Sequence, residues 1–181
     1  MKTVQPIRNR DDIERLRGAL RSSRDHALVA VALNTGLRIG DILRLTVGDV
    51  TPDKTHIFVV QQKTGKTTRN LITPALRTVL DPYLVGKDPA TPLFPSRRDP
   101  SRPIDRIQVY RLLETARRRA GIPYPISPHT LRKTFGWHHY AIHKDVALLQ
   151  TIFRHSAPSI TLRYIGVTAD VIDDSLRNFA L

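Results

Sequence analysis

The last third of the sequence contains side chains that together could break and remake a phosphodiester. His129 and Arg132 are three residues apart, so on a helix both side chains lie on one face. His155 and Tyr164 follow farther along the chain. A guanidinium can grip two phosphate oxygens at once, imidazoles transfer protons, and a phenol can form a covalent bond to phosphorus. Such a set can attack a phosphodiester without a metal ion.

A second group of candidate residues lies earlier in the chain. Arg38 ends the sequence Thr-Gly-Leu-Arg at 35–38, between two predicted helices, and the ends of elements often carry functional side chains. Asp41 is close enough in sequence to orient the Arg38 guanidinium. Lys63 and Lys66 flank a predicted tight turn. Taken alone, each has a simpler interpretation, because surface ion pairs and solvated turn lysines are common.

Hydrophobic periodicity and capping residues predict a mostly helical chain with one small antiparallel β-hairpin. Gly36 is expected to end the second helix as a C-terminal cap. Helices are predicted at 11–21, 24–34, 39–45, 74–84, 104–120, from 128 onward, and at 145–153, 158–164 and 169–179, with strands at 56–60 and 67–73. No internal repeat or second domain is indicated.

The helix that begins at Pro128 is the one that must position the first histidine and arginine. Ser127 is a favourable N-cap, and proline suits the first helical position. The apolar stripe of this helix is expected to carry Leu131, Phe135 and Ile142 toward the core. The His129 and Arg132 side chains would then project from the opposite side.

Composition and charge point to a polyanionic partner. The chain has 181 residues, of which 40% are hydrophobic, which is enough for one domain with a full core. Lys and Arg number 29 against 16 acidic residues, so the net charge is +13, which favours nucleic acid as the partner. The segment 97–119 is rich in arginine, which suits either a DNA-facing surface or a solvated helix face.

Other bulk features exclude several classes of site. The chain has no cysteine, so it has neither disulfides nor thiolate metal sites. It shows no signal peptide and no apolar run of transmembrane length, so a cytoplasmic, nucleoid-associated location is expected. His138, His139 and His143 suggest zinc, but Asp145 is the only acidic ligand nearby. Core or surface histidines are the simpler interpretation, and neither a metal nor another cofactor is predicted.

The order of these motifs resembles the catalytic domain of the tyrosine recombinases, the phage-integrase group. The matching pieces are Thr-Gly-Leu-Arg at 35–38, Lys-Thr-Gly-Lys at 63–66, His-Thr-Leu-Arg at 129–132, His155, and Leu-Arg-Tyr at 162–164. The resemblance covers nearly the whole chain, and five motifs in order are far more specific than one. It implies an α+β catalytic-domain fold over 1–181, with a C-terminal tail helix within 165–181 and no separate N-terminal core-binding domain.

The resemblance also implies residue roles at one scissile phosphate of DNA. The catalytic set would be Arg38, Lys63, His129, Arg132, His155 and Tyr164, with Asp41 in support. Tyr164 would attack, leaving a 3′-phosphotyrosyl link and a free 5′-hydroxyl. Lys63 would protonate the leaving oxygen, with Lys66 as the alternative donor. The DNA-binding surface would include Lys66, Arg69, Arg97, Arg98, Arg102, Arg106, Arg117 and Arg118.

Two departures from the family pattern bear on these expectations. The family usually has glycine or another small or polar residue before the second histidine, where this chain has Arg154. Arg154 would clash, contact phosphate or a subunit, or pair with acidic residues of the tail. Full-length relatives also carry an N-terminal DNA-binding domain, whereas here only 37 residues precede Arg38. The chain is therefore expected to be a catalytic domain alone, either natively minimal or a fragment.

The predicted function is site-specific cleavage and rejoining of double-stranded DNA, as in integration or excision of a mobile element. Self-assembly into a tetramer on DNA and accessory DNA-binding proteins are expected with it. Two alternatives stay open: a type IB-like topoisomerase, and a non-catalytic DNA-binding protein with a vestigial site. By residue type alone, Tyr110, Tyr124 and Tyr140 also compete with Tyr164 as the nucleophile, although none stands in a Leu-Arg-Tyr context.

Overall fold

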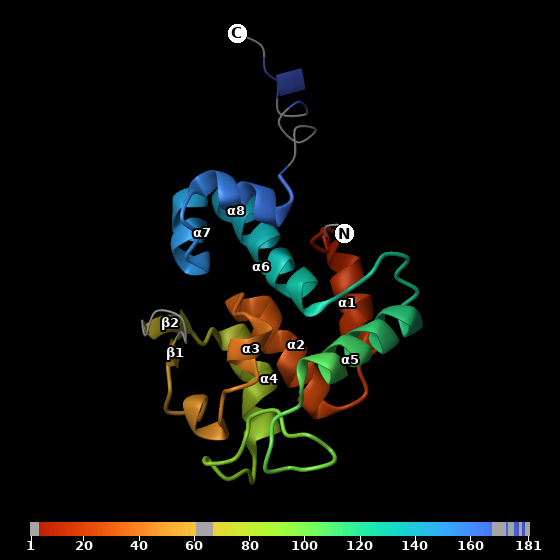
Figure 1. Ribbon diagram of the computed structural model, residues 1–181, viewed down its shortest axis with the longest axis vertical. Helices are drawn as coiled ribbons and strands as arrows, with labels where there is room; N and C mark the ends of the chain where they lie inside the picture. The colour runs from red at the N-terminus through yellow and green to blue at the C-terminus, as the bar shows by residue number, and fades with distance from the viewer. Residues whose placement is uncertain (1–3, 61–66, 168–172, 174–175, 178, 180–181) are drawn as a thin grey trace.

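The computed structural model describes residues 4–60, 67–167, 173, 176, 177 and 179. Helices dominate, and one two-stranded antiparallel sheet lies at the side of the molecule (Figure 1). In chain order the elements are α1 (Arg10–Gly18), α2 (Ser23–Thr35), α3 (Ile39–Ile42), the 3-10 turn η1 (Val47–Asp49), β1 (His56–Val60), β2 (Thr67–Leu71), α4 (Pro74–Leu84), α5 (Arg106–Arg119), α6 (Pro128–His143), α7 (Val146–Phe153) and α8 (Pro158–Ile165). No described helix is long and apolar enough to cross a membrane.

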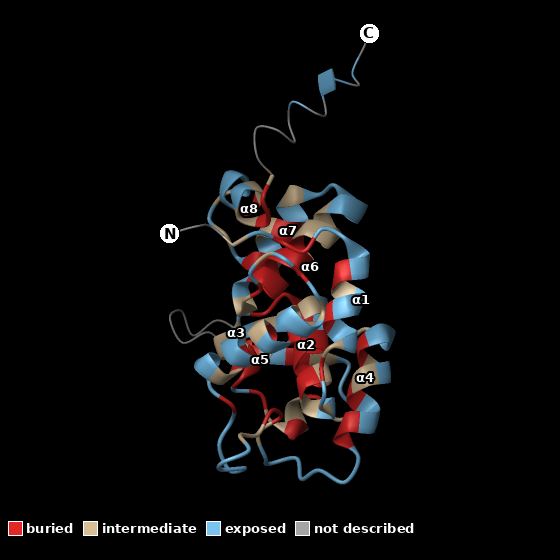
Figure 2. Ribbon diagram, turned by 90° about the vertical axis from the view of Figure 1, so that its right-hand side faces the viewer, coloured by how far each residue is buried: buried red, intermediate tan, exposed pale blue. Residues whose placement is uncertain are grey.

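Helix α2 is the centre of the main core. Its residues 27–32 are all buried, because the helix is apolar nearly all round and packs against both α4 and α6 (Figure 2). Ser22 caps its start by accepting a hydrogen bond from the Asp25 backbone N–H at 3.2 Å. Gly36 ends it with φ of +61°, a left-handed conformation that favours glycine. The rigid end of α2 thereby fixes where the Arg38 segment leaves the core.

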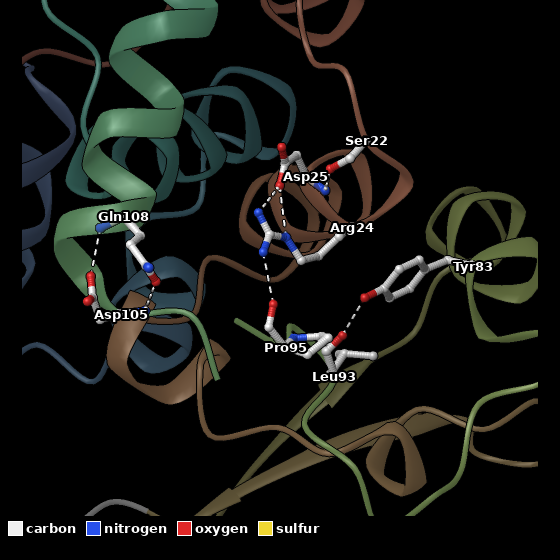
Figure 3. A network of polar contacts seen from close by, with 8 residues as sticks. All are labelled: Ser22, Arg24, Asp25, Tyr83, Leu93, Pro95, Asp105 and Gln108. Atoms are coloured by element: carbon white, nitrogen blue, oxygen red, sulfur yellow. Dashed lines mark hydrogen bonds and ion pairs between the residues drawn. The ribbon is translucent and has the colours of Figure 1, made fainter. Parts of the chain in front are cut away.

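The proline-rich loop between α4 and α5 is pinned to the base of the core by side chains that reach its backbone (Figure 3). Tyr83 donates a hydrogen bond to the Leu93 carbonyl at 2.6 Å, and burial raises the pKa of Tyr83 to about 12. Arg24 donates to the Pro95 carbonyl at 2.9 Å and pairs with Asp25. These bonds satisfy loop carbonyls that no regular element pairs.

The β-hairpin alternates buried and exposed side chains as a half-buried strand should. β1 and β2 are antiparallel, and their register runs from His56 opposite Leu71 to Val60 opposite Thr67. Ile57 faces the core, whereas Phe58 faces outward. The turn at 61–66, with Lys63 and Lys66, lies outside the described residues.

A second, smaller hydrophobic cluster joins α7 and α8 to α6. Its buried members are Leu149, Phe153 and Ile165. Gly136 of α6 permits this close approach, because a Cβ at that position would lie 2.7 Å from atoms of both Phe153 and Ile165. Cβ atoms essentially never come that close, so any side chain at Gly136 would push α7 and α8 away from α6.

The predicted fold class is confirmed, and most predicted elements lie where they were expected. The buried face predicted for α6 was wrong at two residues. Ile142, expected in the core, is 63% exposed, and Arg132, expected on the opposite side, is only 6% exposed. The predicted helix at 104–120 begins later, because Asp105 caps it by accepting from the Gln108 N–H. Most of the predicted tail helix at 169–179 lies outside the described residues.

Candidate active site

Arg132 is the structural centre of the candidate site. Its guanidinium donates to two main-chain carbonyls, that of Gly36 at the end of α2 and that of Phe153 at the end of α7, the latter at 3.2 Å. The guanidinium also lies 4.2 Å from the centroid of the Phe153 ring. A single buried side chain thus joins the Thr-Gly-Leu-Arg segment to the segment that precedes His155. These bonds leave its remaining N–H groups for a ligand, because guanidinium carries five donors.

Tyr164 and His155 are brought into direct contact beside this guanidinium. Their ring centroids are 5.1 Å apart at an interplanar angle of 72°, an edge-to-face arrangement that aromatic rings favour. The Arg132 guanidinium lies 5.9 Å from the Tyr164 ring centroid. Phe153 supports the Tyr164 ring from another side at 5.5 Å and 80°. Three of the sequence-predicted site residues, Arg132, His155 and Tyr164, therefore lie in one cluster.

The His155 imidazole is held in a defined orientation. Its Nδ1 is 3.0 Å from the Thr161 hydroxyl on α8, which is fully buried. Its backbone is fixed to α7 by reciprocal bonds with Gln150, at 3.1 Å each. With Nδ1 engaged, Nε2 is the ring nitrogen left to face a substrate, in the way that a second partner usually orients a functional histidine.

Arg38 and His129 lie at the ends of elements that meet at the same place. Arg38 is the exposed N-cap residue of α3, and His129 is exposed in the first turn of α6. A small depression beside them is lined by Arg38 and Arg132 together with Asp41. Asp41, predicted to support Arg38, pairs with Arg44, and no ion pair joins it to Arg38 within the described residues. The Arg38 guanidinium is therefore left to a ligand.

The electrostatics of the pocket favour neutral imidazoles beside strong cations. Burial, followed by the charges of neighbouring cations, lowers the pKa of both His129 and His155. Burial raises the pKa of the Tyr164 phenol, while the positive charges of Arg132 and Arg38 oppose that rise. Neutral imidazoles can accept protons, and the cations can stabilise anionic oxygen atoms.

His138, His139, His143 and Tyr124 contact other residues, although His139 Nδ1 is buried without a hydrogen-bond partner in the described part of the chain. The His138 Nε2 is 3.0 Å from the Ile7 carbonyl, and the rings of His139 and His143 are 4.5 Å apart. Within the described part of the chain, no group of three or more metal-ligating side chains forms. Tyr124 donates to Asp12, and burial together with that carboxylate raises the pKa of Tyr124. Among the rings of the described tyrosines, only Tyr164 contacts both His155 and Arg132.

The predicted DNA-binding arginines differ in how free their side chains are. Arg117 and Arg118 both bind Glu114, and these bonds lower the pKa of Glu114 to about 2. Arg102 pairs with Asp99 at 3.5 Å. Arg69, Arg97, Arg98 and Arg106 are exposed, and none of them forms an ion pair with a residue that the structure describes. A guanidinium that is already bound to a carboxylate contributes less binding free energy to a phosphate contact, because the existing ion pair must first be broken.

Sequence reasoning missed a groove of arginines between the α1–α2 turn and α5. It has a volume of about 420 Å³, and its arginines are Arg21, Arg24, Arg97, Arg111 and Arg119. Its single carboxylate, Asp25, is neutralised by Arg24. The other four arginines form no ion pair with any residue that the structure describes. The excess of arginine at 97–119 was the available signal, but only the fold shows which of these guanidiniums are free.

Arg154 binds a main-chain carbonyl of the β-hairpin. It caps α7 in the left-handed conformation, with φ of +53°, and its Nη2 donates to the Thr67 carbonyl at 2.7 Å. Its position explains the family preference for glycine there, because glycine adopts this conformation without steric cost. The long side chain also ties the first residue of β2, next to the hairpin turn, to the segment that carries His155.

We expect the Arg154→Gly variant to be at least as stable as the unaltered protein and to anchor the hairpin less firmly. Glycine relieves a left-handed strain of about 1 kcal/mol, which offsets the loss of one exposed hydrogen bond. Thermal unfolding would show an unchanged or higher Tm, and amide exchange near Thr67 would become faster. Arg154→Ala is the matched control, since it removes the same bond but keeps the strain, and it should lower the Tm. Equal Tm values for both variants would contradict this account.

Known proteins resemble this chain over most of its length. The Phage integrase family profile matches residues 9–170. The chain is 42% identical over 181 residues to the probable integrase/recombinase YoeC of Bacillus subtilis, covering 99% of this chain and 98% of that protein. It is 33% identical over 163 residues to tyrosine recombinase XerD of Corynebacterium glutamicum, covering 85% of this chain and 52% of XerD. It thus spans about half the length of XerD.

Solved structures share the same fold. The structure of XerA recombinase matches with a TM-score of 0.81 at 24% identity, covering 98% of this chain and 65% of that one. The post-cleavage complex of XerH recombinase with its difH substrate matches with a TM-score of 0.75 at 17% identity, covering 98% of this chain and 54% of that one. At these identities the likeness concerns the arrangement of helices and strands.

Proposed function

Because this chain belongs to the phage integrase family of tyrosine recombinases, we propose that it cuts and rejoins double-stranded DNA at specific sites through a covalent tyrosyl intermediate. The observation that carries this proposal is the close contact of Tyr164 with both His155 and Arg132. A phenol, an oriented imidazole and a buried guanidinium are the groups that transfer of a phosphoryl group to tyrosine needs.

In the proposed cleavage step the Tyr164 phenol oxygen attacks the scissile phosphorus. A bond forms between that oxygen and phosphorus, and the bond from phosphorus to the 5′-oxygen breaks. The phenol proton passes to a neutral imidazole of the pair His129 and His155, and Lys63 gives a proton to the leaving 5′-oxygen. Arg38 and Arg132 bind the non-bridging oxygens, whose negative charge grows in the transition state.

Rejoining is the reverse of cleavage and needs no external energy source. The phosphotyrosyl bond stores the energy of the broken phosphodiester, so a 5′-hydroxyl can attack it and release the tyrosine. If that hydroxyl belongs to a different duplex, strands are exchanged. Integration or excision of a mobile element, with several subunits assembled on DNA, is the use we propose, since YoeC and XerD carry the names integrase and recombinase.

Covalent capture from a randomised DNA library tests this function directly. Duplexes with random centres and internal nicks are incubated with the protein in excess EDTA, and complexes that survive denaturation are sequenced. We expect a metal-independent adduct on a limited set of sequences. Relaxation of supercoiled plasmid without site preference would favour a topoisomerase, and binding without any adduct would indicate a vestigial site.

We expect the isolated chain to bind DNA weakly and with a steep salt dependence. Each phosphate contact contributes about 0.9 to the slope of log K against log salt. Arg97→Gln and Arg119→Gln should each reduce the slope by about one, because both guanidiniums are free in the groove. Arg118→Gln is the matched control and should change it less, since Arg118 is held by Glu114. Titrations from about 50 to 200 mM salt decide this, and equal slopes for all three variants would contradict the assignment.

A further inference from the structure

Lys133 is a buried cation to which the mechanism above gives no role. It follows Arg132 on α6 and is only 6% exposed. Its ammonium lies 5.1 Å from the centroid of the Tyr164 ring. No carboxylate or hydrogen-bond acceptor within the described residues pairs with it. The Lys133 Nζ is not among the fully buried atoms without a partner, so it keeps a small contact with solvent, and partial burial lowers the pKa of the amine.

Within the described residues, the surroundings of Lys133 offer it no negative charge. The charged and titratable groups that face Tyr164 and its pocket are Arg38 before α3, His129, Arg132 and Lys133 on α6, and His155 after α7. Asp41, the carboxylate beside them, is bound to Arg44. The reaction itself brings negative charge to this place, either on the phenol oxygen or on the phosphate that it attacks.

We propose that Lys133 is a positioning residue for Tyr164: its ammonium holds the tyrosine ring in place and stabilises the negative charge that its oxygen gains during attack. This inference rests on the proposed function. A cation near the face of an aromatic ring is attracted by it, and more strongly where it is partly desolvated. Losing it should slow adduct formation ten- to thirtyfold, which corresponds to about 1.4 to 2 kcal/mol of transition-state stabilisation.

Removing the charge should leave the stability of the fold unchanged or higher but lower the rate of adduct formation. A merely structural role would lower both, so the two measurements together separate the alternatives. Lys133→Met keeps the length and apolar bulk of the side chain but removes a buried, uncompensated charge. We expect the variant to melt at the same temperature as the unaltered protein or higher. At saturating DNA its rate of adduct formation should fall ten- to thirtyfold, while its affinity for DNA stays within about twofold.

Chemical rescue supplies a second readout. Lys133→Ala leaves a cavity that propylamine can enter, so added propylamine should restore part of the lost rate. 1-Propanol, a neutral molecule of the same size, should not. The Lys133→Met protein is the matched control, because its side chain fills the cavity and should block rescue by either molecule.

A third readout does not need DNA cleavage. In protein labelled with 3-fluorotyrosine, the ¹⁹F resonance missing from Tyr164→Phe identifies Tyr164, and its titration gives the pKa of the phenol. In Lys133→Met this pKa should rise, because a nearby positive charge favours the phenolate. If the unaltered protein forms no adduct on any DNA, the proposed function fails, and the melting and ¹⁹F results still judge Lys133.

Several outcomes would overturn the proposal. A wild-type rate of adduct formation by Lys133→Met would do so, as would a lower melting temperature together with an unchanged Tyr164 titration. Equal rescue by propylamine and 1-propanol would show that Lys133 acts through its bulk and not through its charge.

Discussion

A Tyr164→Phe variant is expected to form no covalent complex with DNA, while it folds and binds DNA like the unaltered protein. Phenylalanine keeps the ring, so the contacts with His155 at 5.1 Å and Phe153 at 5.5 Å persist. Only the attacking oxygen is lost. Because no other group can form the bond to phosphorus, the rate should fall by at least about 10⁴-fold, the scale seen when a covalent nucleophile is removed.

The measurement is a denaturing gel of a nicked substrate from the capture experiment, in excess EDTA. Tyr140→Phe is the matched control, because Tyr140 also packs against the small cluster beside α7 and α8. We expect Tyr140→Phe to form the adduct at close to the normal rate. Adduct formation by Tyr164→Phe, or its loss in Tyr140→Phe alone, would show that the nucleophile is wrongly assigned.

Replacement of Lys63 by alanine is expected to slow cleavage of a normal phosphodiester by about 10² to 10⁴-fold, the usual contribution of a general acid. The 5′-alkoxide is a poor leaving group unless a proton reaches it as the bond breaks. A substrate with sulfur in place of the 5′-bridging oxygen releases a thiolate, which needs no proton. The Lys63→Ala variant should therefore recover most of its rate on that substrate.

Lys66→Ala is the matched control, since Lys66 lies on the same predicted turn three residues away. It should cleave both substrates with similar, nearly normal rates. The pattern is read from single-turnover rates on the two substrates. Equal loss on both by Lys63→Ala would rule out a proton-donor role for Lys63, and selective recovery of Lys66→Ala would transfer the role to Lys66.

Local signals explain why so many elements could be predicted from the sequence. Gly36 ends α2 in a left-handed conformation, and Ser127 with Pro128 begins α6, both as their residue types indicate. The alternation of Ile57 and Phe58 across β1 is equally local. Each of these features depends on neighbours within four residues, which is the range over which a sequence pattern carries structural information.

The errors concern faces and partners that only tertiary packing decides. Ile142 fits the apolar stripe of α6, but this end of the helix extends past the core, so its side chain is exposed. Arginine is usually a surface residue, yet Arg132 is buried because its guanidinium donates hydrogen bonds to main-chain carbonyls at the ends of α2 and α7. The ion pair that Asp41 forms is likewise decided by the fold, since its partner is Arg44, two residues beyond the end of α3.

The candidate site also divides into residues that the sequence motifs predict and residues that only tertiary packing reveals. The order of the motifs indicated which side chains would meet, and the structure places Tyr164, His155 and Arg132 together. The sequence could not single out Lys133, because a lysine beside an arginine is usually solvated and only the fold shows that this one is buried against Tyr164.

The small cluster that holds α7 and α8 is distinct from the main core, so the part of the site that carries Tyr164 has hydrophobic contacts of its own. Leu149, Phe153 and Ile165 are its buried hydrophobic members, each contributing on the order of 1.5 to 3 kcal/mol, whereas α1 to α5 share the much larger core around α2. A segment opens at a free energy set by the contacts it must give up. We therefore expect the segment that carries Tyr164 to open at a lower free energy than the body that carries Arg38.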